Sequence, residues 1–188
     1  MYAIACVDNS LGLGYKGDLL VKSKIDMEHF KTFTAQQHII VGRKTFESMN
    51  ITSTNGRIFH VITSSMMSSV HDRLRGKSSN IFIYNSPEDV MKAIKASGKI
   101  YKAVPPVVIG GASIYKAFMP YIDTVILTVA HYNAPDVDSY FPSEILNINE
   151  WKRMVLDRWN EALVINDRLV NFGFERQLVQ RINPITED

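Results

Sequence analysis

The stretch VVIGGASIY, residues 107–115, decides the fold class of this chain. A short apolar run ends at Gly110-Gly111, and a helical pattern begins at the next residue. Backbone without side chains at such a turn lets an anionic group approach the free N–H groups of the helix start. A tight strand-to-helix turn that binds nothing would have the same pattern. The stretch therefore predicts a strand followed by a helix, and by itself it leaves the presence of a ligand open.

The stretch VGRKT, residues 41–45, repeats this pattern with two cations and a hydroxyl after the glycine. Two such turns indicate a shared phosphate-bearing ligand at the carboxyl ends of parallel strands. Outward from both turns, short apolar runs alternate with helical patterns, and two β-rich runs close the chain. The sequence therefore predicts an α/β fold, a mostly parallel sheet with an antiparallel edge, in one domain over residues 1–188. We expect strands at residues 2–7, 38–41, 58–63, 80–84, 107–109, 124–131, 151–159 and 171–179, and helices at 23–33, 45–49, 86–97 and 112–118.

The composition excludes several classes of protein. Of 188 residues, 46% are hydrophobic and 21% are charged, which is typical of an ordered globular chain. The single cysteine, Cys6, has no partner for an intramolecular disulfide. A net charge of +2 does not favour a nucleic-acid or membrane partner, and no apolar run approaches the roughly 20 residues that span a bilayer. Residues 1–8 lack the features of a signal or transit peptide, so we expect a cytoplasmic protein.

Asp26 is the most informative acid. It shares a helix face with Phe30 and Phe33, and a carboxylate on an apolar face is costly unless it is paired. With Ser23 as the N-cap, Asp26 occupies the third helical position, where an acid can complete a capping box. Two interpretations stay open: a helix cap, or a buried carboxylate that binds a cationic or donor-rich ligand edge.

A glycine-spaced segment, GLGYKG at residues 12–17, matches the Gly-x-Gly-x-x-Gly pattern of dinucleotide-binding folds. In those folds the strand leads directly into the first glycine, whereas here residues 8–11 intervene and the helix begins only near residue 23. The segment is therefore interpreted as a loop, mobile beside a site. No metal site is expected either, because the five histidines show no ligand spacing: they are His29, His38, His60, His71 and His131.

Taken together, these segments resemble the dihydrofolate reductase family. VGRKTFESM at residues 41–49 is similar to the family's Met-Gly-Arg-x-Thr-x-Glu-Ser motif, and IGGASIY at residues 109–115 matches its Ile-Gly-Gly-x-x-x-Tyr segment. Gly56-Arg57 resembles its Pro-Gly-Arg turn, and DSYFP at residues 138–142 its late loop. The resemblance spans nearly the whole chain, with Leu127-Thr128 and Phe174-Glu175 in the last strands. It implies a mixed eight-stranded sheet flanked by four helices, and reduction of 7,8-dihydrofolate to 5,6,7,8-tetrahydrofolate by NADPH.

The resemblance also implies roles for individual residues. Asp26 would bind the 2-amino group and ring nitrogen of the pterin with support from Thr128, and these two with Leu19 form the implied catalytic set. Arg57 would pair with the substrate's glutamate α-carboxylate. Residues 13–20 would form a mobile loop over the nicotinamide, and the Gly110–Gly111 peptide would be cis. The implied substrate-binding residues are Ile4, Ala5, Asp26, Met27, Phe30, Lys31, Met49, Arg57, Ile109, Tyr115 and Thr128. The implied NADPH-binding residues are Cys6, Leu13, Gly14, Gly42, Arg43, Lys44, Thr45, Thr63, Ser64, Ser65, Ile109, Gly110, Gly111, Ala112, Ser113, Ile114 and Tyr115.

The chain departs from the family pattern in places, and other functions stay open. The family usually has Pro-Trp where this chain has Leu20-Val21, and Gly and Arg where it has Ala112 and Ser113. The alternatives are a riboflavin-pathway reductase that uses NADPH and a non-catalytic protein that binds NADPH or pterin. Nucleic-acid binding would rest on charge alone, at Arg43-Lys44 and residues 73–77. We expect a monomer, with a homodimer as the alternative, and thymidylate synthase as a metabolic partner.

Overall fold

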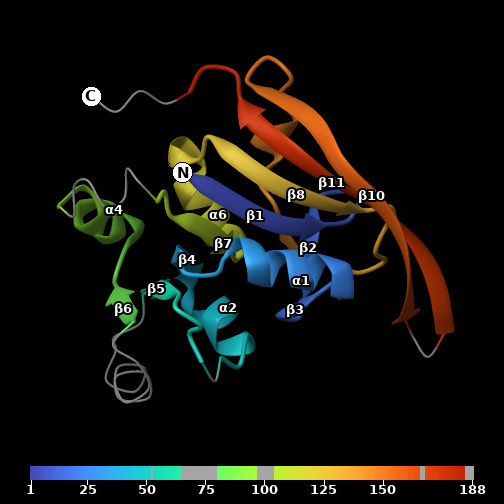
Figure 1. The fold of residues 1–188 in the computed structure, drawn as a ribbon, viewed down its shortest axis with the longest axis horizontal. Helices are drawn as coiled ribbons and strands as arrows, with labels where there is room; N and C mark the ends of the chain where they lie inside the picture. Colours follow the sequence, from blue (N-terminus) through green and yellow to red (C-terminus); the bar gives the residue numbers. More distant parts are fainter. Residues whose placement is uncertain (52, 65–79, 97–103, 166–167, 185–188) are drawn as a thin grey trace.

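The computed structural model describes residues 1–51, 53–64, 80–96, 104–165 and 168–184. Eight strands form one central sheet in the order β10-β11-β8-β1-β7-β4-β5-β6 (Figure 1). The pairings from β8 through β1 to β6 are parallel, and β11 and β10 add an antiparallel edge. The predicted mixed, mostly parallel sheet is confirmed. Its strands are β1 (Tyr2–Val7), β4 (His38–Gly42), β5 (Ile58–Ile62), β6 (Ile81–Tyr84), β7 (Val107–Gly110), β8 (Thr124–Ala130), β10 (Trp151–Ile165) and β11 (Arg168–Arg181).

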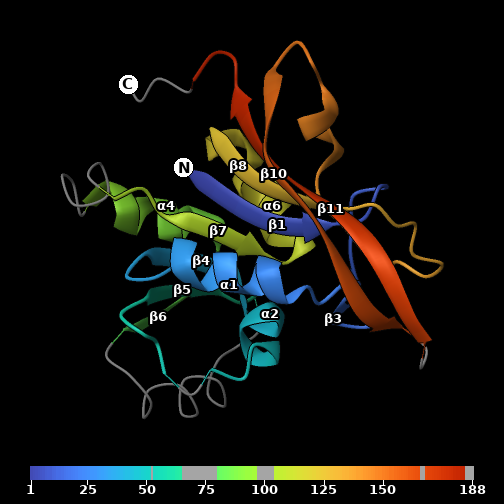
Figure 2. The same cartoon turned by 45° about the vertical axis from the view of Figure 1, so that its right-hand side comes forward.

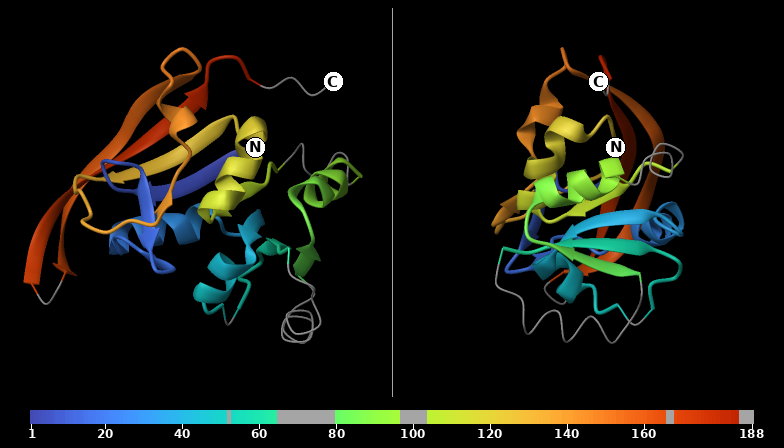
Figure 3. Two further views of the ribbon diagram at one scale, coloured as in Figure 1. Left: turned by 180° about the vertical axis from the view of Figure 1, so that it is seen from behind. Right: turned by 90° about the vertical axis from the view of Figure 1, so that its left-hand side faces the viewer.

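Four α-helices in the described part of the chain cover the two faces of this sheet (Figure 3). Phe30 of α1 and Phe46 of α2 belong to the cluster on one face, and Val90 of α4 and Phe118 of α6 belong to the cluster on the other. Because both faces are covered, β7 is buried along its whole length, as expected for a central parallel strand. Within the same residues, no helix is long and apolar enough to cross a membrane. The helices are α1 (Lys24–Phe33), α2 (Arg43–Ser48), α4 (Pro87–Ala96) and α6 (Ala112–Phe118), with 3-10 turns at Met119–Tyr121 and Ser143–Leu146.

A second, three-stranded sheet stands where the glycine spacing predicts a loop at residues 12–17. β2 (Gly12–Tyr15) pairs with β3 (Asp18–Leu19) and with β9 (Ser139–Tyr140), which comes from far along the chain. The prediction of a loop was therefore wrong for residues 12–15, which form β2. The error arises because the spacing of glycines along a short segment carries no information about a distant partner strand such as β9.

The closing hairpin is longer than its sequence pattern predicts. The alternation predicts strands at residues 151–159 and 171–179, whereas β10 and β11 extend to Ile165 and from Arg168. β11 pairs with β8 only from Phe174 onward, so the outer part of the hairpin projects past the sheet (Figure 1 and Figure 2). Several apolar side chains of this outer part are exposed, which obscures the alternation of polar and apolar residues.

Candidate active site

The amino terminus of α1 is capped by residues other than the Asp26 carboxylate. The Ser23 hydroxyl accepts a hydrogen bond from the Asp26 backbone N–H at 3.1 Å, as the predicted capping box requires. The Glu161 carboxylate of β10 accepts hydrogen bonds from the Ser23 hydroxyl and, at 2.7 Å, from the Lys24 backbone N–H. Desolvation acts to raise the pKa of Glu161, but these hydrogen bonds bring it below its ordinary value. Glu161 thus caps the amino terminus of α1, a role that local sequence rules assign to the Asp26 carboxylate.

The Asp26 carboxylate instead meets the sheet. Thr128 is buried in β8 and its hydroxyl donates a hydrogen bond to this carboxylate. Desolvation raises the pKa of Asp26, while the hydrogen bond from Thr128 and the positive charge of Arg176 act in the opposite direction. The structure therefore brings the two predicted polar site residues together, with the acid in surroundings that favour binding of N–H donors.

Four of the predicted apolar site residues form one wall on the same face of the sheet as Asp26. Ile4 and Ile109, near the middle of β1 and the end of β7, are buried in one cluster, against which Phe30 and Met49 pack. Ala5 belongs to the cluster on the opposite face, so its side chain does not join this wall. Apolar walls with one convergent polar group are typical of small-molecule sites.

Arg57 is fixed against the carboxyl end of α1. Its Nε donates to the Thr34 hydroxyl at 3.0 Å and its Nη2 to the Lys31 carbonyl oxygen at 3.0 Å. The guanidinium follows a turn at Asn55-Gly56, where both residues have positive φ, and only 8% of Arg57 is exposed. The Lys31 side chain is exposed, as is much of Met27. Arg57 is therefore a preorganised cation at one end of the helix that carries Asp26.

Tyr115 of α6 ties β1 to the end of β7. Its hydroxyl donates a hydrogen bond to the Ile4 carbonyl oxygen at 2.7 Å. A Cβ added to Gly110 would lie only 2.5 Å from Cε2 of the Tyr115 ring. Gly110 has a φ of +98°, so this position requires glycine for two reasons. Desolvation raises the pKa of Tyr115 and of Cys6, and the charge of Asp26 adds to both effects. Both groups are neutral at neutral pH, which leaves Asp26 as the ionisable acid among these three.

The two glycine turns meet at one edge of the sheet, because β4 and β7 are neighbours. A Cβ added to Gly42 would lie 3.0 Å from Ile114, and one added to Gly111 would lie 3.1 Å from the Thr45 hydroxyl. Gly42 and Gly111 are the N-caps of α2 and α6, and neither has a side chain to cap the helix. The predicted cis peptide at Gly110–Gly111 is confirmed. Two helix starts with free N–H groups therefore lie close together, which suits an anionic ligand.

The other residues predicted to bind a cofactor flank this edge, apart from Ser65, which lies outside the described residues. β5 runs parallel to β4, so Thr63 and Ser64 follow it at the same edge, with Thr63 buried and Ser64 exposed. The Arg43 guanidinium donates to Glu47 at 2.9 Å. The helix starts themselves contain Arg43, Lys44 and Thr45 of α2 and Ala112, Ser113 and Ile114 of α6.

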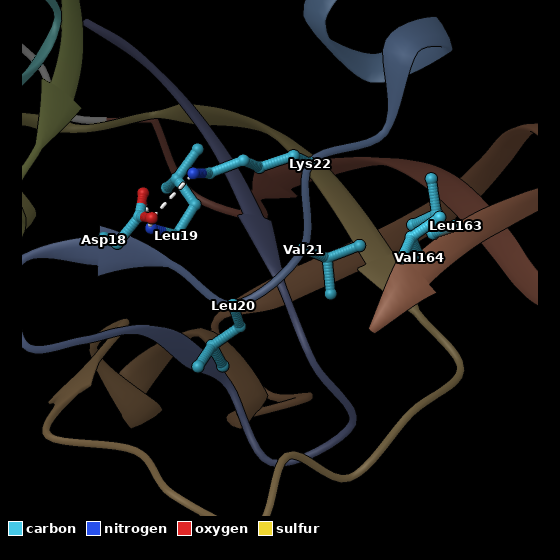
Figure 4. Close-up of a pocket in the computed structure, with 7 residues that line it drawn as sticks. All are labelled: Asp18, Leu19, Leu20, Val21, Lys22, Leu163 and Val164. Carbon is cyan, nitrogen blue, oxygen red and sulfur yellow. Dashed lines mark hydrogen bonds and ion pairs between the residues drawn. The ribbon is translucent and has the colours of Figure 1, made fainter. Parts of the chain in front are cut away.

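The predicted mobile loop lies next to the closing hairpin. Leu13 is buried and Gly14 pairs with β3, where Leu19 is 48% exposed. A cavity of about 290 Å³ separates residues 18–22 from Leu163 and Val164 of β10 (Figure 4). The structure thus places Leu19 in the lining of this cavity, beside the hairpin.

Sequence reasoning missed three residues that shape the site. Glu161 caps α1, and Arg176 of β11 lies close enough to affect the pKa of Asp26. The buried carboxylate of Asp8 accepts backbone hydrogen bonds from Ser10 at 2.8 Å and Gly12 at 2.7 Å and holds the turn into β2. A signal existed for Arg176, since a lone cation at an inward position of an alternating strand is unusual. No comparable signal existed for Glu161.

These features define an α/β protein with two adjoining subsites. One is an apolar wall beside a single desolvated acid, and the other is a glycine-lined edge that suits a phosphate-bearing ligand. In the part of the chain that the structure describes, no group of three or more His, Cys, Asp and Glu side chains could hold a metal ion.

The chain belongs to the dihydrofolate reductase family, whose model matches residues 1–163. It is 32% identical to dihydrofolate reductase type 1 of Escherichia coli over 130 residues, which cover 69% of this chain and 73% of that relative. It is 45% identical over 58 residues to a bifunctional dihydrofolate reductase-thymidylate synthase of Paramecium tetraurelia, covering 31% of this chain and 13% of the relative. Its fold matches the solved dihydrofolate reductase of Enterococcus faecalis complexed with NADP(H), with a TM-score of 0.68, 20% identity and coverage of 97% and 96% of the two chains.

Proposed function

We propose that this chain reduces 7,8-dihydrofolate to 5,6,7,8-tetrahydrofolate with NADPH as the reductant. The observation that carries the proposal is the position of the Asp26 carboxylate. Glu161 caps the helix in its place, and Thr128 donates a hydrogen bond to it beside an apolar wall. Membership of the dihydrofolate reductase family supports the same substrate and cofactor.

The glycine-lined edge fits NADPH on chemical grounds. Gly42 and Gly111 leave two helix starts uncapped by side chains, and Arg43, Lys44 and Ser64 add cations and a hydroxyl at the same edge. These residues would hold the phosphates, with Thr45, Ala112 and Ser113 beside them. When bound there, NADPH supplies the hydride for the reduction.

The residues of the chain would contribute binding and electrostatics rather than covalent chemistry. The ionised Asp26 accepts hydrogen bonds from the 2-amino group and ring N–H of the pterin and thereby raises the basicity of the ring, so that solvent can protonate it. Ile4, Phe30 and Ile109 exclude water from the reacting face. Arg57, already oriented by Thr34, presents its planar fork to a substrate carboxylate.

The test is the substitution Asp26→Asn, assayed by NADPH oxidation with dihydrofolate. We expect the variant to bind NADPH as tightly as the unmodified chain and to lose most of its turnover near neutral pH, because an amide cannot carry the charge that the pterin needs. Glu88→Gln, a change of the same kind at an exposed position of α4, serves as the control and should leave turnover unchanged. Turnover of Asp26→Asn equal to that of the control would contradict the assignment.

The same assay separates the two alternative functions. A riboflavin-pathway reductase would oxidise NADPH without dihydrofolate as its acceptor, and methotrexate would not block it. A non-catalytic binding protein would bind NADPH and oxidise it with no pterin. We further propose a cytoplasmic monomer of one domain that consumes dihydrofolate delivered by thymidylate synthase.

A further inference from the structure

Arg176 is a buried cation on the face of the sheet that α1 covers. Only 7% of the residue is exposed, and its Nε and Nη2 atoms are buried with no hydrogen-bond partner among the described residues. A buried charged donor without a partner costs stability, so a guanidinium at an inward position of β11 calls for a compensating role.

Two residues of β10 fix the guanidinium in place. Its Nη1 donates to the Asp157 carboxylate at 2.8 Å, and its central carbon lies 4.7 Å from the centre of the Trp159 ring. Trp159 is itself stacked on Phe174 with ring centres 5.1 Å apart. The side chain is therefore held on one side by a charge pair and on the other by an aromatic surface.

The strand register places Arg176 next to the acid's own partner. Arg176 of β11 lies opposite Thr128 of β8, and Thr128 donates a hydrogen bond to Asp26. The positive charge of the same guanidinium acts to lower the pKa of Asp26, His29 and Cys6, which come from two other elements. Arg176 is thus a shared electrostatic neighbour of the groups that surround the acid.

The groups that face Asp26 come from every element packed around it. The titratable ones are His29 of α1, Cys6 of β1, Tyr115 of α6 and Glu161 of β10. Desolvation and the charge of Arg176 lower the pKa of His29, so this ring is neutral at neutral pH. Cys6 and Tyr115 are neutral too, and Glu161 is an anion that disfavours a second negative charge. Among these groups, Arg176 supplies the permanent positive charge that favours an ionised Asp26.

We propose that Arg176 is a positioning residue for the reaction: its guanidinium, fixed by Asp157 and Trp159, keeps the Asp26 carboxylate ionised beside the apolar wall. The role in the reaction rests on the proposed function, whereas the effect on the carboxyl group does not. Arg176 touches neither substrate nor cofactor in this scheme, and it acts through Asp26.

The test measures the Asp26 carboxyl directly. Its side-chain 13C resonance is identified as the one absent from Asp26→Asn and is followed by NMR as a function of pH. In Arg176→Met, which keeps an unbranched apolar stem in place of the guanidinium and removes the charge, we expect the titration midpoint to rise by about one pH unit. Arg176→Lys keeps the charge and should restore a midpoint close to that of the unmodified chain.

A matched control lies on the same strand. Arg181 also covers a tryptophan, with its guanidinium 4.4 Å from the centre of the Trp151 ring, and donates to the Met119 carbonyl oxygen at 3.0 Å. Arg181→Met should lower stability and leave the Asp26 midpoint unchanged. An equal shift of the Asp26 midpoint in Arg181→Met overturns the inference, because the shift would then come from a general loss of stability. No shift in Arg176→Met overturns it as well.

A second variant guards against failure of Arg176→Met to fold. Asp157→Asn changes a partly exposed side chain, retains the guanidinium and removes its counter-charge, so the Asp26 midpoint should fall. An unchanged or raised midpoint there also overturns the inference. The pH profile of kcat/KM for dihydrofolate then separates the two proposals. A carboxyl midpoint that moves while the profile stays fixed supports the effect of Arg176 on the Asp26 carboxyl and contradicts the role of Asp26 in turnover.

Discussion

Asp26 illustrates at the scale of one residue how function and stability oppose each other. Desolvation raises the pKa of its carboxyl above the ordinary value of 3.8, so ionisation is harder in the folded chain than in the unfolded chain. Below that ordinary value the group is protonated in both states and costs nothing. As pH rises towards the folded pKa, the unfolded state releases its proton first, and the folded state loses stability relative to it.

We therefore expect Asp26→Asn to be more stable than the unmodified chain at neutral pH and equal to it below about pH 3.8. Urea unfolding over a series of pH values measures the difference. Asp18→Asn is the control, since Asp18 is exposed and its hydrogen bond with Lys22 lowers its pKa. A loss of stability in Asp26→Asn at neutral pH would mean that Thr128 and Arg176 outweigh desolvation.

For Asp26 the sequence left two interpretations open, a helix cap and a carboxylate that binds a ligand edge; the structure bears on the first, and the second stays a prediction. Its backbone N–H completes the cap with Ser23, as helix rules predict, but its carboxylate lies against the sheet. What separates the two roles is Glu161, which is 138 residues from Ser23 in the chain. Local patterns locate the helix, its N-cap and the acid, yet they contain no information about a capping group from β10.

At the scale of the element, the stability of α1 depends on this borrowed cap. Hydrogen bonds from Ser23 and the Lys24 backbone keep the pKa of Glu161 below its ordinary value of 4.5 against the effect of desolvation. A depressed carboxyl contributes stability above its unfolded pKa, and this contribution is lost as pH falls through the folded pKa. The helix that carries Asp26 is therefore expected to loosen in acid.

We expect Glu161→Gln to lower stability by about 0.5–1 kcal/mol at neutral pH, because it removes the negative charge at the helix start. The difference from the unmodified chain should vanish in acid, once Glu161 is protonated in both states. Thermal unfolding followed by circular dichroism at several pH values measures it. Glu28→Gln, on the exposed side of the same helix, is the control; a loss as large there would show that any removed acid on α1 has this effect.

The elements that the sequence predicts well are those whose evidence is local. The central parallel strands β1, β4 and β7 are largely buried and appear in the sequence as continuous apolar runs, so they are found within a residue or two of their observed bounds. The prediction for the segment around Gly12 is wrong because its pairing depends on a distant strand. The prediction for the closing hairpin is too short because its outer part leaves apolar residues exposed. The same holds in the site: local patterns predict the motif glycines and Asp26 and mark Arg176 as an unusual inward cation, but its position opposite Thr128 comes only from the register of β11.

At the scale of the whole molecule, the last strand completes the sheet that the first strand begins. β11 pairs with β8, which in turn pairs with β1, so the two ends of the chain meet in three adjacent strands. β11 also supplies Phe172 and Phe174 to a small cluster with Val21 and Ala130, and Val179 to the cluster that α4 and α6 cover, and each of the three is at most 5% exposed. The family model matches only residues 1–163 and stops before this strand. The proposal of one domain over the whole chain therefore predicts that the matched part cannot fold alone.

We expect a chain truncated after Leu163 to lack a cooperative unfolding transition. Burial of each large apolar side chain contributes about 1.5–3 kcal/mol, so the three lost from β11 amount to much of the about 5–15 kcal/mol that stabilises a typical domain. β8 would also lose its antiparallel neighbour and become an exposed edge. The control is truncation after Pro184, which keeps β11 and should unfold in one transition at the temperature of the full chain. A cooperative transition and NADPH binding by the shorter chain would contradict the single-domain proposal, since they would make residues 1–163 an independent folding unit.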